Sequence, residues 1–116
     1  MPNYLLLLHQ RTDRPIPPTA EGRAAITQEY MAWADQLRAE GRHKAANKLT
    51  NDAGKHLTFT PGHVTITDGP YAESKEVIGG YYIIGATDYA EACRVAEHSP
   101  HIKYGGRIEI REIHEL

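Results

Sequence analysis

The segment 68–76, DGPYAESKE, combines a rigid turn with several ionisable side chains between two strand-like stretches. Pro70 fixes its own φ angle, and Gly69 accepts backbone angles that other residues avoid. The turn can therefore hold Asp68 and Tyr71 in set directions, where an acid and a base could orient a polar substrate and move a proton. The alternative is a plain connection in which Asp68 caps a turn and the charges face water.

A small set of polar residues forms the predicted site. The catalytic candidates are Asp68 and His9, and the ligand-binding candidates are Tyr30, Tyr71, Lys75 and Tyr81. Asp68 or His9 would act as the base, while Lys75 or Tyr71 would stabilise developing charge. Two structural alternatives stay open: the Asp68 carboxylate could accept backbone N–H groups, and Tyr30 could belong to the core.

Other reactive residue types give weaker signals. The seven histidines are scattered without a helical HxxxH or HExxH pair, so neither a metal nor another cofactor is expected. His98 and His101 bracket the end of a predicted helix, where the helix dipole favours a capping role. The single cysteine, Cys93, shares an apolar helical face with Ala92 and Ala96 and is predicted to be buried.

Length and charge limit the class of protein. The 116 residues fit a single domain, residues 1–116, and the net charge of −2 argues against partners such as nucleic acid or an anionic membrane. No charged-then-apolar leader opens the sequence, and no apolar run approaches the roughly 20 residues of a spanning helix. We therefore expect a cytoplasmic protein.

Hydrophobic periodicity predicts the strands. They cover residues 4–9, 47–50, 56–59, 64–67, 77–84 and 107–111. The first is apolar throughout, so it is expected to be a central strand buried on both faces that ends at His9. Pro61 and Gly62 predict a hairpin with one wet face, and 47–50 is assigned to a sheet edge. In the last strand, Ile108 and Ile110 face one side and the charged residues the other.

Two helices complete the pattern. The first, residues 20–40, carries the apolar stripe Ile26, Tyr30, Trp33 and Leu37, begins at Thr19 or Thr27, and ends at Gly41. The second begins at Asp88 and ends before Pro100. This order predicts an α+β ferredoxin-like sandwich, an antiparallel sheet with two helices on one face. The other sheet face would be a large exposed apolar patch, so we expect a second copy to cover it in a homodimer.

Three blocks of sequence carry a family resemblance. They are Tyr4-Leu5-Leu6-Leu7, residues 67–76 with Gly79-Gly80-Tyr81-Tyr82, and residues 100–105 with Ile108-Glu109-Ile110-Arg111. Together they resemble the YCII-related family, in the branch called the DGPF-domain proteins, and the resemblance spans nearly the whole chain. Tyr71 stands where this branch usually has phenylalanine, which adds a hydroxyl group.

The resemblance implies a dimeric α+β barrel with a ligand cleft near the sheet and the dimer interface. The wider family includes a dehydrochlorinase acting on a chlorinated hydroquinone. Its YCII-type members pair a histidine on the first helix with an aspartate ahead of a proline. Those places fall here at Tyr30 and Ser99. A tyrosine with an ordinary pKa near 10 is a poor replacement for an imidazole base, so the enzyme assignment stays open.

Three functions are consistent with these residues. The leading hypothesis is a protein that binds a small aromatic or polar metabolite in a cleft lined by His9, Tyr30, Asp68, Tyr71 and Tyr81. The second is an enzyme, of the lyase, isomerase or dehydrochlorinase kind, that performs proton transfer or elimination. The third is a regulatory module acting through a protein partner, because relatives of this branch are often encoded beside, or fused to, sigma factors.

Overall fold

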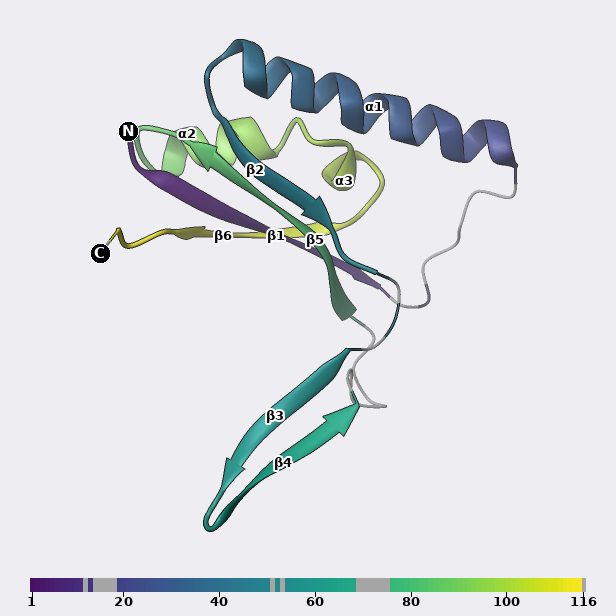
Figure 1. Ribbon diagram of the computed structural model, residues 1–116. Coiled ribbons are helices and arrows are strands. Elements are labelled where there is room, and N and C mark those ends of the chain that lie inside the picture. Colours follow the sequence, from purple (N-terminus) through teal and green to yellow (C-terminus); the bar gives the residue numbers. More distant parts are fainter. Residues whose placement is uncertain (12, 14–18, 51, 53, 69–75, 116) are drawn as a thin grey trace.

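The computed structural model describes residues 1–11, 13, 19–50, 52, 54–68 and 76–115. Its elements are β1 (Asn3–Arg11), α1 (Ala20–Ala39), β2 (His43–Lys48), β3 (Lys55–Thr60), β4 (His63–Asp68), β5 (Glu76–Gly85), α2 (Tyr89–Ala96), α3 (Pro100–Lys103) and β6 (Arg107–Glu112). Four strands form a sheet in the order β2-β5-β1-β6, and β3 and β4 form a separate two-stranded sheet (Figure 1). No helix in these ranges is long and apolar enough to cross a membrane.

The main sheet is antiparallel throughout, and its helices lie on one face (Figure 1). The predicted α+β sandwich is therefore confirmed. Side chains alternate between the two faces of a strand, so Tyr4, Leu6 and Leu8 of β1 face the helices and are buried. They pack in one cluster with Ile84 of β5 and Trp33 of α1. This cluster is the core of the domain.

The opposite sheet face is open. Leu5 and Leu7 of β1 are only partly buried, which makes the prediction of a strand buried on both faces wrong for the single chain. Register pairs Leu5 with Ile83 and Leu7 with Tyr81, so these four side chains share that face. Ala45 of β2 pairs with Ile83 and joins them. We call these five residues the open face.

The long helix α1 agrees with its predicted bounds. The Thr19 side chain accepts a hydrogen bond from the Gly22 amide at 3.0 Å, which caps the first turn. At the other end, Gly41 adopts a φ of 71°, in the left-handed region that glycine accepts most easily. The predicted stripe faces the sheet, and its members Trp33 and Leu37 are fully buried.

Several boundaries differ from the predictions. Strand β2 begins at His43 instead of 47, because the edge pairing with β5 overrides the local helix and turn preferences of this stretch. Strand β1 continues past His9 to Arg11. The short helix α3 was not predicted. Ser99 caps it by accepting from the Ile102 amide at 3.4 Å, and Pro100 occupies its first turn, where proline is tolerated.

The β3–β4 hairpin forms around the predicted Pro61-Gly62 turn, and Gly62 has a φ of 90°. The expectation of one wet and one dry face is wrong for the single chain. The hairpin pairs with no other described strand, and its large apolar side chains are exposed, while Thr60, Thr65 and Thr67 are partly buried. Within the part of the chain that the structure describes, no layer covers the apolar side, because the hairpin stands apart from the main sheet (Figure 1).

The buried face of α2 differs from the prediction. Asp88 caps the helix by accepting from the Glu91 amide at 2.8 Å, as expected. Ala92 and Ala96 are buried, but Cys93 is exposed. Cys93 follows Ala92 by one residue and is therefore turned about 100° away from it around the helix. A narrow stripe of small side chains is enough to pack this short helix, and Cys93 lies outside it.

The exposure of Cys93 gives a direct prediction. A thiol reagent such as 5,5′-dithiobis(2-nitrobenzoate) should modify one thiol per native chain, about as fast as in urea-unfolded protein, because exposure controls access to the thiolate. The released chromophore is followed by absorbance, with Cys93→Ser as the blank. Modification that occurs only after unfolding would show that Cys93 is buried.

Candidate functional site

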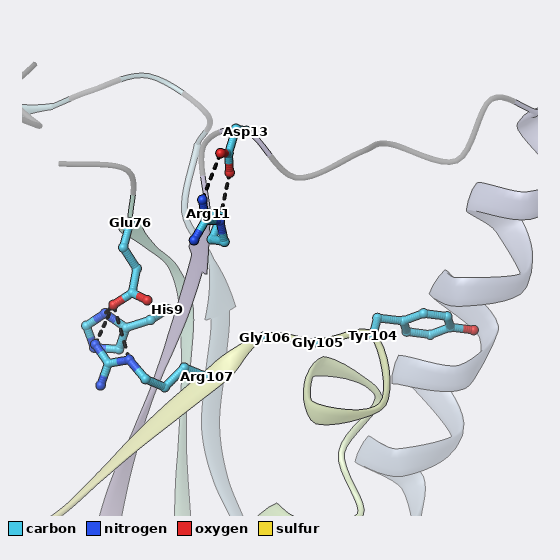
Figure 2. Close-up of a pocket in the computed structure, with 8 residues that line it drawn as sticks. All are labelled: His9, Arg11, Asp13, Glu76, Tyr104, Gly105, Gly106 and Arg107. Carbon is cyan, nitrogen blue, oxygen red and sulfur yellow. Dashed lines mark hydrogen bonds and ion pairs between the residues drawn. The ribbon is translucent and has the colours of Figure 1, made fainter. Parts of the chain in front are cut away.

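A cavity of about 330 Å³ lies at the end of the main sheet, where β1 ends and β5 and β6 begin. It is lined by His9, Arg11, Asp13, Glu76, Tyr104, Gly105, Gly106 and Arg107 (Figure 2). Charged side chains of both signs therefore come together from three strand ends. The volume is at the lower end of the range for ligand pockets and suits a molecule of one ring.

Antiparallel pairing brings these residues together. The register of β1 against β5 shifts between Leu8 and His9, a bulge that changes the direction of the strand. Beyond this point His9 pairs with Ile78 on one side and with Arg107 on the other. The last residues of β1 thus lie beside the first residues of both neighbours, although they are far apart in the sequence.

The imidazole of His9 lies between two carboxylates. Its Nε2 is 3.0 Å from Oε1 of Glu109, and its Nδ1 is 3.3 Å from Oε1 of Glu76. The side chain is only 14% exposed. Both ring nitrogens can donate to these acceptors at once only when the imidazole is protonated. The two carboxylates therefore hold the ring in one orientation.

Arginine side chains balance the carboxylates. Nε of Arg107 donates to Glu76 at 3.2 Å, and Nη2 of Arg107 donates to the same oxygen. This hydrogen bonding lowers the pKa of Glu76, and the hydrogen bond from His9 lowers the pKa of Glu109. Arg11 binds both carboxylate oxygens of Asp13, at 2.8 and 2.9 Å. Both carboxylates next to His9 are therefore ionised at neutral pH.

Behind the cavity lies a buried histidine. His101 of α3 is 2% exposed, and its Nε2 lies 2.8 Å from the carbonyl oxygen of His9 and 3.2 Å from that of Arg107. Since carbonyl oxygens only accept, Nε2 carries the proton and donates to them. Nδ1 is then the acceptor for the Tyr30 hydroxyl at 3.5 Å. His101 is a core residue that ties β1 to β6, and the predicted capping role is wrong.

Of the four predicted site residues that the structure describes, two lie at or next to the cavity and two lie elsewhere. His9 lines the cavity, and Tyr30 lies behind it, in contact with His101. The Tyr81 hydroxyl accepts a hydrogen bond from Asn47 at 2.9 Å on the open face. Asp68 lies at the end of the hairpin, is largely exposed, and forms an ion pair with Lys55. Tyr71 and Lys75 lie outside the described residues.

Sequence reasoning missed four members of the site: Glu76 and Glu109 as partners of His9, Arg107, and the buried His101. A signal for two of them was present, because strict alternation in the last strand places Arg107 and Glu109 on one side. Alternation alone does not give the register that sets this strand beside β1. Within the described ranges, no three histidine, cysteine, aspartate or glutamate side chains form a cluster able to hold a metal ion.

Fold and cavity together define a class: a ferredoxin-like α+β domain with a polar pocket at one end of its sheet. The chain belongs to the YCII-related domain family, which matches residues 3–116. The predicted family is thus confirmed at this level. No characterised protein in a curated collection matches the sequence.

A solved structure shows the same fold. It is 5-chloro-2-hydroxyhydroquinone dehydrochlorinase (TftG) from Burkholderia phenoliruptrix AC1100, in complex with 2,5-dihydroxybenzoquinone. The match covers 98% of this chain and 95% of that chain, with a TM-score of 0.53 and 17% sequence identity. At this identity the similarity establishes the shared α+β fold and nothing about activity.

Proposed function

We propose that the protein binds a small, anionic or phenolic aromatic metabolite in the cavity beside His9. The observation that carries this proposal is the fixed imidazole of His9, held between Glu76 and Glu109 in a cavity also lined by Arg11 and Arg107. Both ring nitrogens of His9 face carboxylates, so the donors left for a ligand are guanidinium N–H groups, which form strong hydrogen bonds with carboxylate and phenolate oxygens. The quinone bound by TftG, a protein of the same fold, supports a flat oxygenated ring as the ligand class.

Proton transfer is the second candidate function, and the flanking carboxylates favour it. Because Nδ1 of His9 lies against the Glu76 carboxylate that lines the cavity, the proton of a bound hydroxyl group could reach a neutral His9 by way of Glu76 and give an imidazolium ion. Glu76 and Glu109 would stabilise that ion, because both are positioned at its ring nitrogens. In this proposal His9 takes the role of base that sequence analysis gave to His9 or Asp68. Asp68 pairs with Lys55 and is not among the residues that line the cavity, so this proposal assigns it no role.

We also propose that the protein is a homodimer that packs through the open face. The support is the row of partly exposed apolar side chains on β1, β2 and β5, a surface that proteins seldom leave in contact with water. Assignment to the DGPF branch is a further proposal, and it rests on the sequence block at 67–76. Residues 69–75 of that block lie outside the described residues.

The test is ligand binding measured by thermal shift and then by calorimetry. The probes are 2,5-dihydroxybenzoquinone, hydroquinone, and mono- and dihydroxybenzoic acids, because a ligand of the native state raises its melting temperature. A hit should bind His9→Gln at least about tenfold more weakly, because the ring fixes Glu76 and its partner Arg107 in the cavity wall and a hydrogen bond to a charged group contributes roughly 1.5–3 kcal/mol. Asp68→Asn and Tyr81→Phe serve as controls that should bind as the wild type does.

Two results would count against the proposal. Equal affinity of the wild type and His9→Gln for every hit would place the ligand elsewhere. Loss of binding in Asp68→Asn would place the ligand site at the end of the hairpin. Turnover of any hit is followed separately by absorbance, so that binding without reaction supports the first function and excludes the second for that molecule.

A further inference from the structure

The β3–β4 hairpin, residues 55–68, has one apolar and one polar face. Register pairs Leu57 with Ile66 and Phe59 with Val64, so these four side chains lie on the same face. We call residues 55–68 the arm and these four side chains its apolar face. The opposite face carries only His56, Thr58, Thr60, His63, Thr65 and Thr67. Such a division is typical of a sheet that is covered on one side.

None of the described residues covers the apolar face of the arm. The exposed fractions are 80% for Phe59, 67% for Leu57, 64% for Ile66 and 55% for Val64. An isolated two-stranded hairpin is at best marginally stable in water, because it has no layer to pack against. Four large apolar side chains gathered on one face of such a hairpin indicate that another surface covers them.

The position of the arm points to the surface concerned. The arm extends from the main sheet on the side opposite α1 (Figure 1). The open face lies on that side as well, because the helices cover the other one. A second molecule that packs against the open face would therefore lie next to the arm. Since every copy supplies one arm and one open face, a twofold axis covers both surfaces of both molecules.

Charge and area agree with this arrangement. Lys55 and Asp68 form an ion pair at the base of the arm, so they do not present an isolated charge to an apolar partner. The open face spans three strands, or roughly 300 Å² in projection, and the arm adds roughly 200 Å². Stable interfaces bury about 800 Å² per partner. The arm therefore brings the contact closer to what a stable dimer needs.

We propose that the arm clasps a second copy of this chain, with Leu57, Phe59, Val64 and Ile66 buried in the dimer. This inference rests on the homodimer proposed above and adds an element to it. The partner is a second copy rather than a different protein, because the same chain displays the uncovered open face on the side to which its arm extends.

Sedimentation velocity over a range of concentrations tests the arm. The wild type should be a dimer in the micromolar range, and Phe59→Thr/Ile66→Thr should raise the dimer dissociation constant at least about tenfold, because central buried apolar residues dominate interface energies. Threonine keeps strand propensity and matches the opposite face of the arm. The control, His56→Gln/Thr58→Ser, alters the polar face and should leave the dissociation constant unchanged.

Each other outcome has a defined meaning. A wild-type dimer that is equally tight in the apolar-face variant would overturn the role of the arm and keep the homodimer. A monomeric wild type would overturn both, and the arm would then serve a different partner. If the variant fails to fold, hydrogen exchange of wild-type residues 55–68 decides. Protection that increases with protein concentration supports the proposal, and rapid exchange at every concentration overturns it.

Discussion

Replacing His101 with alanine should lower the free energy of unfolding by about 2–4 kcal/mol, because the substitution removes hydrogen bonds and leaves a cavity. The side chain is 2% exposed, and its Nε2–H is shared by the carbonyl oxygens of His9 and Arg107. Removing it leaves those oxygens without this donor at the point where β1 and β6 meet. Urea denaturation followed by circular dichroism measures the loss.

A neighbouring histidine provides the control for this substitution. His98 follows α2 and is exposed, so His98→Ala should change the unfolding free energy by less than about 0.5 kcal/mol. Binding at the cavity separates a local from a global effect. His101→Ala should weaken ligand binding even at temperatures where it is folded, because its loss loosens the backbone that positions His9. If His101→Ala were as stable as the wild type, the hydrogen bonds of His101 to the His9 and Arg107 carbonyl oxygens would contribute nothing measurable to stability.

Replacing Gly106 with alanine should also be strongly destabilising, by about 1–3 kcal/mol, since overpacked cores are forced to shift. A Cβ atom at this position would lie 2.3 to 2.6 Å from three atoms of the His101 ring. The ring cannot retreat without losing its hydrogen bonds to the two carbonyl oxygens. Thermal and urea denaturation of Gly106→Ala give the size of the effect.

The double variant identifies the cause of that effect. In His101→Ala/Gly106→Ala the added methyl group occupies space left by the imidazole, so the double variant should be more stable than the sum of the two losses predicts. Gly105→Ala is a useful comparison, because a Cβ there meets nothing within 4 Å and only its φ of 88° opposes alanine. Additive losses at 101 and 106 would exclude the steric explanation.

Most elements of the fold, α3 excepted, could be predicted from the sequence because their signals are local. Apolar periodicity placed Trp33 and Leu37 on the buried stripe of α1, and alternation placed Ile108 and Ile110 on one side of β6. The exposure of Cys93 on α2 could not be predicted in this way. Spacings of three and four on an eight-residue helix fit more than one face, and only packing selects between them.

The site was harder to predict because it depends on register. His9 was identified, but its partners Glu76 and Glu109 come from two other strands. Their approach depends on the register shift between Leu8 and His9, which falls opposite Gly79. Glycine within a strand is compatible with a bulge there, but it does not determine which residues pair beyond it. Asp68 was predicted to be a site residue because a rigid turn follows it. In the structure Asp68 forms an ion pair with Lys55 and is not among the residues that line the cavity.

The strand order also determines how the domain avoids uncontrolled self-association. The free edges of the main sheet are β2 and β6. Lysines at 44 and 48 and an irregular register after His43 interrupt the first edge, and charged residues at every second position of β6 protect the other. Neither edge offers a flat, uncharged row of backbone groups to which another strand could add. The sheet is therefore protected against growth into fibres through its edges, while its face stays available for a closed assembly.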